Sequence, residues 1–173
     1  MLIDFELRNA DVTYGPDAFK DKRGLQMNVL ELQLEYIPSL IELYENFDID
    51  AQFQGVPPTH MDLRIAWLQR LLRSGIHLIA LMNDGNIVGH AALMELPARK
   101  SCEFIIVVVK QHRDNGIGTK LCEATKLWAK ALGYKSIWLN VSCSNSSAIH
   151  VYKKVGFRVL NPLNAELEME VGL

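Results

Sequence analysis

Two glycines in a polar loop are the residues of this sequence whose spacing most directly suggests chemistry. Gly116 and Gly118 follow the polar run 110–115, which itself follows six consecutive apolar residues, 104–109. That apolar run is too short for a membrane span and too rich in β-branched residues for a helix, so it predicts a buried strand. From Ile117 onward the apolar spacing becomes helical. A strand, a glycine loop and a helix in this order direct several backbone N–H groups toward one point, which suits a phosphate-bearing ligand.

Two common phosphate-binding loops do not fit this stretch. A dinucleotide fingerprint needs a third glycine three residues after its second, but that position holds Leu121. A nucleoside-triphosphate loop needs Gly-Lys-Ser/Thr, whereas Gly118 is followed by Thr119 and only then by Lys120. On its residues alone, the loop is therefore either another class of anion site or an ordinary turn.

A second motif lies downstream and reads Asn145-x-x-Ala148-x-x-x-Tyr152-x-x-x-Gly156-Phe157. Its tyrosine follows Ala148 by four residues on a partly apolar helix face, where a lone tyrosine is usually a core residue. The asparagine can cap the helix or hydrogen-bond a ligand, and the two roles are compatible.

The two motifs together resemble the GNAT superfamily of N-acetyltransferases. The first motif in this chain is Arg113-x-x-Gly116-x-Gly118 after Val108. It matches the superfamily pattern Arg/Gln-x-x-Gly-x-Gly/Ala at the end of a central strand, and the second motif follows at the expected distance. The resemblance covers roughly residues 25–173, which we expect to form the acetyltransferase domain. Residues 1–24 are an N-terminal extension of unclear structure.

The resemblance implies acetyl-CoA as the acetyl donor. In such folds the central strand and its successor splay apart, and the pantetheine arm lies in the gap, hydrogen-bonded to the strand backbone around Val108. Backbone amides of the glycine loop would bind the pyrophosphate, and the glycines allow its close approach. The implied cofactor-binding residues are Val108, Arg113, Asn115, Gly116, Ile117, Gly118, Thr119 and Asn145.

The resemblance also assigns the acid role to Tyr152. A general base is harder to identify. Many members place a glutamate six residues before the valine that Val108 matches, but here that position is Cys102 and Glu103 comes one residue later. A shift of one residue turns a strand side chain to the other face unless a bulge intervenes. Glu103 is therefore a candidate base, with Glu95 as another.

Composition bounds the remaining possibilities. A chain of 173 residues suits a single domain with a sizeable core. A net charge of −2 gives no basic surface for nucleic acid, and no apolar stretch or leader predicts a membrane or secretory segment. Three cysteines without close pairing favour a reduced, cytoplasmic setting. The five histidines are scattered, so we expect no metal site.

The surrounding pattern predicts an α/β (α+β) domain with a mixed, mostly antiparallel sheet flanked by helices. We expect a weak edge strand at 2–7, strands at 25–30, 76–82, 86–94, 104–109, 135–141, 157–160 and 167–171, and helices after Ile37, Thr59, Ile117 and Asn145. Asn83-Asp84-Gly85 predicts a hairpin turn, residues 97–100 a second turn, and Thr59 with Asp62 a capping box.

The expected function is acetyl transfer to a primary amine by direct attack in a ternary complex, since no cysteine shows a positioned histidine partner. The acceptor, a small-molecule amine or a peptide N-terminus, would be bound by residues 47–59 and the turn at Pro97. Two alternatives stay open: a non-catalytic acyl-CoA-binding or regulatory module, and a transferase for longer acyl chains. A homodimer is compatible with the sequence.

Overall fold

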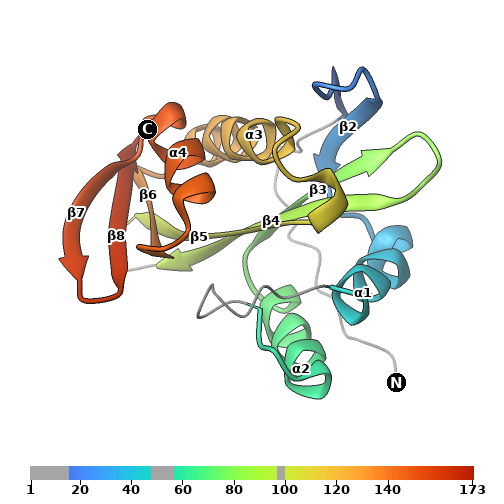
Figure 1. Ribbon diagram of the computed structural model, residues 1–173, viewed down its shortest axis with the longest axis horizontal. Coiled ribbons are helices and arrows are strands. Elements are labelled where there is room, and N and C mark those ends of the chain that lie inside the picture. The colour runs from blue at the N-terminus through green and yellow to red at the C-terminus, as the bar shows by residue number, and fades with distance from the viewer. Residues whose placement is uncertain (1–15, 48–56, 97–99) are drawn as a thin grey trace.

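The structure, a computed structural model, describes residues 16–47, 57–96 and 100–173, and within them eight strands form one sheet (Figure 1). The spatial order is β1-β2-β3-β4-β5-β6-β8-β7. Every neighbouring pair is antiparallel except β5 and β6. The strands are β1 (Asp17–Lys20), β2 (Gln26–Glu31), β3 (Ile76–Met82), β4 (Ile87–Leu96), β5 (Ser101–Val108), β6 (Ser136–Ser142), β7 (Arg158–Leu163) and β8 (Glu166–Gly172).

The helices cover both faces of the sheet (Figure 1). Helices α1 (Ile37–Glu45) and α2 (Met61–Leu72) lie on one face, and α3 (Ile117–Ala131) and α4 (Ser146–Val155) lie on the other. Two short 3-10 turns, η1 (Leu34–Tyr36) and η2 (Lys110–His112), precede α1 and follow β5. This mixed, mostly antiparallel sheet with flanking helices confirms the expected fold class.

Alternation along the strands divides the core between the two faces. In β3, Leu78 and Ala80 pack in the cluster that contains α3 and α4, whereas Ile79 between them packs against α1 and α2. In β5, Phe104 belongs to the α3/α4 side and Val107 to the α1/α2 side. Strands that are apolar on both faces are therefore the ones with helices on both sides.

The β5 and β6 strands separate after a short parallel contact. They pair only at Ser101↔Ser136, Cys102↔Ile137 and Glu103↔Trp138. On its other side β5 stays paired with β4 as far as Val108. The stretch of β5 from Phe104 to Val108 therefore lacks a strand partner on its β6 side, within the part of the chain that the structure describes. This is the splay that the resemblance implies.

A buried polar chain links α1 to the sheet on the opposite face. The Tyr44 hydroxyl is 2.8 Å from His90 Nδ1, and His90 Nε2 is 3.1 Å from His77 Nδ1. The chain ends at the backbone carbonyl of Ser74, 3.2 Å from His77 Nε2. All three side chains are buried. Buried polar groups must find partners of this kind, so the chain fixes α1 on β3 and β4.

Most expected elements are confirmed to within one or two residues at one end or both. The hairpin turn at Asn83-Asp84-Gly85 joins β3 to β4, with Gly85 at φ 87°, and Gly133 follows α3 at φ 84°. Asn145 is the N-cap of α4, which is one of the two roles expected for it. The expected edge strand at residues 2–7 and most of the turn at 97–100 lie outside the described residues.

Two local expectations are wrong. Thr59 and Asp62 do not form a capping box, because the N-cap of α2 is His60 and no side chain caps it. The start of α2 is held instead by Arg64, whose guanidinium donates to the carbonyls of Pro58 and Thr59 at 3.0 and 2.7 Å. Residues 17–20 were expected to be irregular but form β1, which pairs with β2.

Candidate active site

The glycine loop runs from the end of β5 to the start of α3. Gly116 is the N-cap of α3 in the left-handed conformation, at φ 91°, and no side chain caps the helix. The first helical bond runs from Lys120 N to Gly116 O at 3.0 Å. The N–H groups of Ile117, Gly118 and Thr119 consequently have no acceptor within the helix. Together with the helix dipole, they form a site suited to an anion.

The space beside Gly118 is open. A Cβ built on this glycine would meet only Val108 Cγ2, at 3.9 Å, and a Cβ on Gly116 would meet nothing within 4 Å. Gly118 thus faces the end of β5 across an open space, and a side chain at position 118 would fill that space. This space next to the helix N-terminus leaves room for a ligand to approach the backbone closely.

The free edge of β5 leads into this loop. Val109 N donates to Val88 O of β4 at 3.0 Å. Because successive residues of a strand direct their backbone groups to opposite sides, Ile106 and Val108 direct theirs into the gap beside β6. The Val108 carbonyl accepts a hydrogen bond from Arg113 Nε at 3.1 Å. The N–H groups of Ile106 and Val108 are the ones that an extended ligand in the gap would meet.

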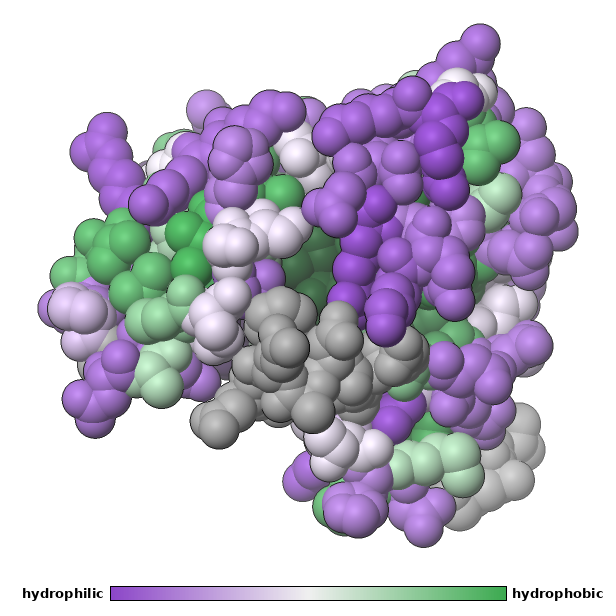
Figure 2. Space-filling view, in the orientation of Figure 1, coloured by the Kyte–Doolittle hydropathy of each residue, from purple (hydrophilic) through white to green (hydrophobic). Residues whose placement is uncertain are grey.

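Arg113 lies between this edge and α1. Its guanidinium carbon is 5.9 Å from the centre of the Phe47 ring, and its own carbonyl accepts from Asn115 Nδ2 at 2.7 Å. Such a position places a fixed positive charge near the mouth of the gap. In the space-filling view, a hollow with an apolar floor opens near the middle of the face shown, with hydrophilic residues along one side (Figure 2).

The second motif places α4 next to the loop. Asn145 Oδ1 accepts from Ala148 N at 3.1 Å, so its side chain caps α4. In the first turn of the helix, Ser147 Oγ donates to Asp114 Oδ1 at 3.0 Å. The loop and the N-terminus of α4 are therefore tied together, although 33 residues separate the two side chains along the chain.

Tyr152 lies on the α3/α4 side, buried in the core. Its ring centre is 6.3 Å from that of Phe104, the first β5 residue beyond the paired section, and 5.6 Å from that of Phe157. Burial raises the pKa of Tyr152 above its ordinary value, and the neighbouring Cys122 adds to this. The phenol therefore stays protonated, and burial also makes it a weaker acid than an exposed tyrosine.

Glu103 lies at the point where the strands part. It is the last β5 residue that pairs with β6, and its side chain is half-buried. Its neighbours Cys102 and Phe104 face α3 and α4, so alternation turns Glu103 toward the α1/α2 side. Burial raises the pKa of its carboxyl group. Glu103 and Tyr152 thus flank the start of the gap from opposite faces of the sheet.

The alternative base, Glu95, has a different environment. It pairs with Cys102 across β4 and β5, and its carboxylate accepts a hydrogen bond from the Tyr134 hydroxyl. Tyr134 follows α3, so this contact lies on the α3/α4 side at the closed end of the β5–β6 pair. Of the two glutamates, only Glu103 lies where the gap opens on the α1/α2 side.

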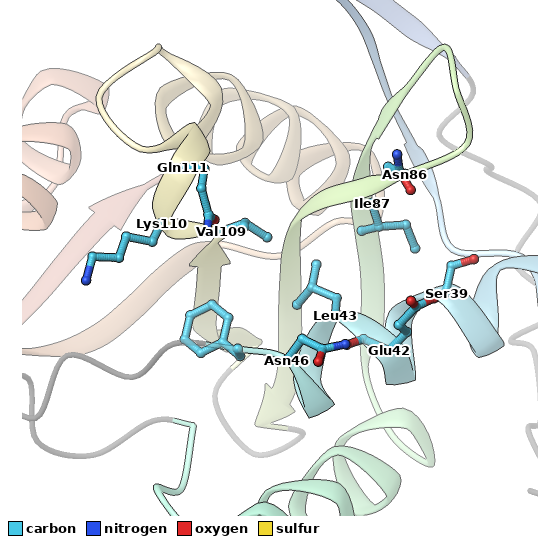
Figure 3. A pocket seen from close by; sticks show the side chains of 10 residues that line it. Ser39, Glu42, Leu43, Asn46, Asn86, Ile87, Val109, Lys110 and Gln111 are labelled. Atoms are coloured by element: carbon cyan, nitrogen blue, oxygen red, sulfur yellow. The ribbon is translucent and has the colours of Figure 1, made fainter.

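A pocket of about 190 Å³ lies between α1, the start of β4 and the end of β5 (Figure 3). Its walls are partly apolar, from Leu43, Ile87 and Val109, and partly polar, from Glu42 and Asn46. Further lining residues are Ser39, Phe47, Asn86, Lys110 and Gln111. The pocket therefore adjoins the glycine loop on the α1/α2 face, away from Tyr152.

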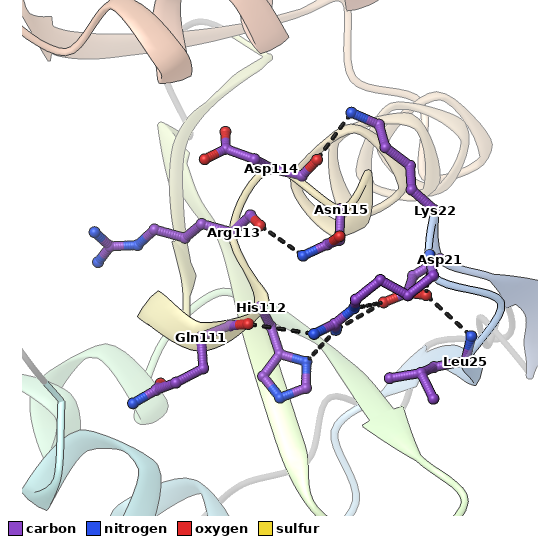
Figure 4. Close-up of polar contacts among 9 residues, drawn as sticks. Asp21, Lys22, Leu25, Gln111, His112, Arg113, Asp114 and Asn115 are labelled. Carbon is purple, nitrogen blue, oxygen red and sulfur yellow. Dashed lines mark hydrogen bonds and ion pairs between the residues drawn. The ribbon is translucent and has the colours of Figure 1, made fainter.

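Sequence reasoning missed one group of residues at the site. The turn between β1 and β2 contacts the glycine loop through Lys22 and Arg23 (Figure 4). Arg23 Nη2 lies 2.9 Å from His112 Nδ1, and Lys22 Nζ donates to the carbonyl of Asp114 at 2.8 Å. Nothing in the local pattern of residues 16–24 indicates these contacts, because they join segments about ninety residues apart.

Residues 16–47, 57–96 and 100–173 contain neither a membrane-spanning helix nor a cluster of metal-binding side chains. In these parts of the chain, no helix is long and apolar enough to cross a membrane. Nor do three or more histidine, cysteine, aspartate or glutamate side chains gather there in a way that could hold a metal ion.

Comparison with known proteins points to one family. The sequence model of the family described as "Acetyltransferase (GNAT) family" matches residues 39–157. An N-alpha-acetyltransferase from Sulfurisphaera tokodaii is 35% identical over 92 residues, covering 46% of this chain and 55% of that protein. The L-amino acid N-acetyltransferase AaaT from Escherichia coli is 32% identical over 108 residues, covering 60% and 64%. The chain thus spans only part of the length of these curated relatives.

Solved structures share the fold at low sequence identity. The GNAT domain of S. lividans PAT superposes with a TM-score of 0.76 at 16% identity, covering 91% of this chain and 97% of that domain. Spermidine N-acetyltransferase from Vibrio cholerae, solved with CoA and spermine, gives a TM-score of 0.66 at 18% identity, covering 84% and 95%. At these identities the likeness concerns the fold alone.

Proposed function

Because the chain belongs to the acetyltransferase (GNAT) family, we propose that it transfers the acetyl group of acetyl-CoA to a primary amine by direct attack in a ternary complex. The observation that carries this proposal is the splay of β5 and β6, which opens beside an uncapped helix N-terminus and the open space at Gly118. An unpaired strand edge and an anion cradle in line suit a ligand with an extended amide arm and a pyrophosphate.

The proposed cofactor contacts follow from this geometry. Val108 directs its backbone N–H into the gap and would bind an amide of the pantetheine arm. The loop amides from Arg113 to Thr119, including those of Asn115, Gly116, Ile117 and Gly118, would surround the pyrophosphate. The Asn145 amide caps α4 with its oxygen, which leaves its Nδ2 hydrogens to face a ligand. When bound, acetyl-CoA supplies an activated acetyl thioester.

Two residues would handle protons. Glu103, on the α1/α2 side of the splay, would accept the proton of the incoming amine directly or through water. Its raised pKa brings the carboxylate closer to the basicity that this task needs. Tyr152, on the opposite face and against Phe104, would donate a proton to the departing sulfur. The base would take a proton from the attacking nitrogen and the acid would give one to the departing sulfur. Because the two groups lie on opposite faces of the sheet, they would not compete for one proton.

Direct transfer is favoured over an acyl-cysteine route by the state of the thiols. Cys102 and Cys122 are buried, and burial raises the pKa of the Cys122 thiol. A buried thiol with a raised pKa provides little thiolate, which is the nucleophilic form. Cys143 is exposed and lies after β6, with its sulfur near the carbonyl of Asn164.

The acceptor is proposed as a primary amine on a small molecule or at a peptide N-terminus. Two relatives are named for α-amino acceptors of these kinds, an N-alpha-acetyltransferase and an L-amino acid N-acetyltransferase. The α1/α2 face at Glu103 is where such an amine would approach, because the proposed base lies on that side of the splay.

The test is an acetylation screen of the purified protein with acetyl-CoA and a panel of free amino acids, polyamines and peptides. Free thiol release should depend on the added amine, and mass spectrometry should find the acetyl group on its nitrogen. Tight binding of acetyl-CoA with no amine-dependent release across the panel would favour a non-catalytic acyl-CoA-binding module. Faster release from longer acyl-CoA donors would redirect the assignment to another acyl chain.

A further inference from the structure

The turn between β1 and β2, residues 21–25, lies against the glycine loop (Figure 4). Three of its donors bond to loop carbonyls. Lys22 N donates to Asn115 O at 3.1 Å, and Lys22 Nζ donates to Asp114 O at 2.8 Å. The third, Arg23 Nη1, is 3.4 Å from Gln111 O. The carbonyl side of the loop is therefore occupied by the turn.

These bonds fix more than the carbonyl groups. In a trans peptide unit the C=O and the following N–H point in opposite directions. When Lys22 holds the carbonyls of Asp114 and Asn115, the N–H groups of Asn115 and Gly116 must therefore point away from the turn. They join the free N–H groups at the start of α3, and such a run of amides is the usual form of an anion-binding concavity.

The loop conformation needs external support of this kind. Asp114, a residue with a side chain, has φ 61°, and Gly116 has φ 91°. A left-handed conformation is unfavourable for a non-glycine residue and persists where the surroundings hold it. The surroundings here are Lys22 on the carbonyl of Asp114 and Ser147 on its carboxylate.

A buried carboxylate holds the turn itself in shape. Asp21 Oδ1 accepts from the backbone N–H groups of Arg23 and Leu25 at 2.8 and 3.0 Å, and Oδ2 accepts from Arg23 Nε at 2.8 Å. The residue is only 6% exposed. Its bond to Nε orients the Arg23 guanidinium, whose Nη2 reaches His112 Nδ1. The positively charged side chains are thus aimed at the loop before any ligand arrives.

We propose that Lys22 and Arg23 are positioning residues for the pyrophosphate of acetyl-CoA, which orient the loop amides by holding the loop carbonyls from behind. This rests on the proposed function, in which the loop binds that pyrophosphate. The N-terminal hairpin is then a working part of the cofactor site, although neither sequence motif includes it.

The experiment compares Lys22→Met, Arg23→Met and the double variant with the parent. Acetyl-CoA affinity is measured by calorimetry, and turnover is measured with acetyl-CoA and with S-acetylpantetheine, which lacks the pyrophosphate. We expect the double variant to lose about tenfold or more in acetyl-CoA affinity, the scale of one lost charge-assisted hydrogen bond. Its kcat, and its use of S-acetylpantetheine, should stay within about threefold of the parent. Lys22→Arg, which keeps a charged donor, should recover most of the affinity.

The matched control is Lys20→Met, which removes the same charge from an exposed position of β1. If it weakens acetyl-CoA as much as Lys22→Met does, the effect is general electrostatic attraction and the positioning role is wrong. An equal loss with S-acetylpantetheine would also overturn it, because that ligand does not reach the loop. The amide resonance of Asn115, whose peptide carbonyl is that of Asp114, should shift in Lys22→Met without ligand; an unchanged resonance contradicts the proposal.

Two further outcomes separate this proposal from the proposed function. If Gly118→Val abolishes acetyl-CoA binding but the double variant binds like the parent, the loop is the cofactor site and the positioning role is wrong. If Gly118→Val also binds like the parent, the cofactor assignment itself fails. Should the double variant not fold, Lys22→Met alone decides, since it leaves the Asp21–Arg23 pair intact.

Discussion

His77 and His90 lie on neighbouring strands with their rings stacked, 5.3 Å between centroids, and share a hydrogen bond of 3.1 Å. The Ser74 carbonyl can only accept, so His77 Nε2 must carry a proton and donate to it. His77 Nδ1 then accepts from His90 Nε2, and His90 Nδ1 accepts from the Tyr44 hydroxyl. Burial lowers the pKa of both rings, so both are neutral in the fold, and these hydrogen bonds then fix each ring in a single tautomer.

The first prediction concerns stability at low pH. Burial lowers the pKa of His77 to about 4, and burial together with His77 lowers the pKa of His90. Below a pH of about 6.5 the unfolded chain binds protons that the folded chain does not, so the free energy of unfolding falls as the pH falls. For His77 alone we expect a loss of about 2 kcal/mol between pH 7 and pH 5, measured by urea denaturation.

A matched pair of variants isolates this effect. His77→Gln keeps an acceptor and a donor but does not titrate, so its stability should depend less steeply on pH than that of the parent. His150→Gln, at an exposed position on α4, should leave the parent's slope unchanged. If the free energy of unfolding depends equally on pH in the parent and in His77→Gln, burial of His77 does not hinder its protonation and the prediction is wrong.

The second prediction is that Gly118→Val removes cofactor binding without unfolding the protein. The added side chain enters open space bounded by Val108, so it should clash with a ligand and not with the core. We expect acetyl-CoA affinity to fall at least about a hundredfold in calorimetry, with the helix and the thermal midpoint largely retained. Ala131→Val, at the exposed end of α3, adds a similar bulk and serves as the control.

The third prediction is that Tyr152→Phe lowers turnover by roughly a hundredfold or more. The ring that packs against Phe104 and Phe157 is kept, so the free energy of unfolding should change by less than about 1 kcal/mol. Some activity should survive, because a thiol with a pKa near 8.5 is a fair leaving group. Tyr36→Phe, in η1, is the control hydroxyl deletion. Unchanged turnover in Tyr152→Phe would remove the acid assignment, and a collapse of the fold would mark a core role.

The fourth prediction distinguishes the two glutamates. If Glu103 is the base, kcat/KM should fall as the pH drops through its pKa, which burial holds above the ordinary range for glutamate. Glu103→Gln should lose about a hundredfold in kcat/KM and also lose this acidic limb of the pH profile. Glu95→Gln, which disturbs the contact with Tyr134 at the closed end of the β5–β6 pair, should retain the limb. Retention of the limb in Glu103→Gln would rule out this residue.

The spacing of apolar residues predicted those strands and helices that pack in the core. Strands β3 to β6 and helix α3 have side chains whose burial follows the expected periods. Strand β1 escaped prediction because four residues, Asp17–Lys20, alternate only between half-buried and exposed positions. The start of α2 was mispredicted because Arg64, from within the helix, bonds the carbonyls that precede it. Such contacts depend on tertiary structure and leave no mark on local spacing.

The site was predictable only in part, for a similar reason. The family motifs identified the glycine loop, and the structure then showed open space at Gly118 and the splay of β5 and β6. Whether Asn145 caps α4 could be decided only from the bond to Ala148. The contacts of Lys22 and Arg23 join residues 88 to 92 positions apart, a separation over which no sequence pattern carries information.

The hairpin formed by β1 and β2 also bears on where a recombinant fragment of this protein can be cut. The family match begins at residue 39, so a fragment trimmed to it would keep both motifs intact. It would nevertheless lose Met27 and Val29 from the core, the edge that covers β3, and the turn behind the glycine loop. Such a fragment would keep every residue that the family model matches. It would lose the hairpin whose turn holds the glycine loop in its conformation. The limit of detectable similarity is therefore not the limit of the folding unit.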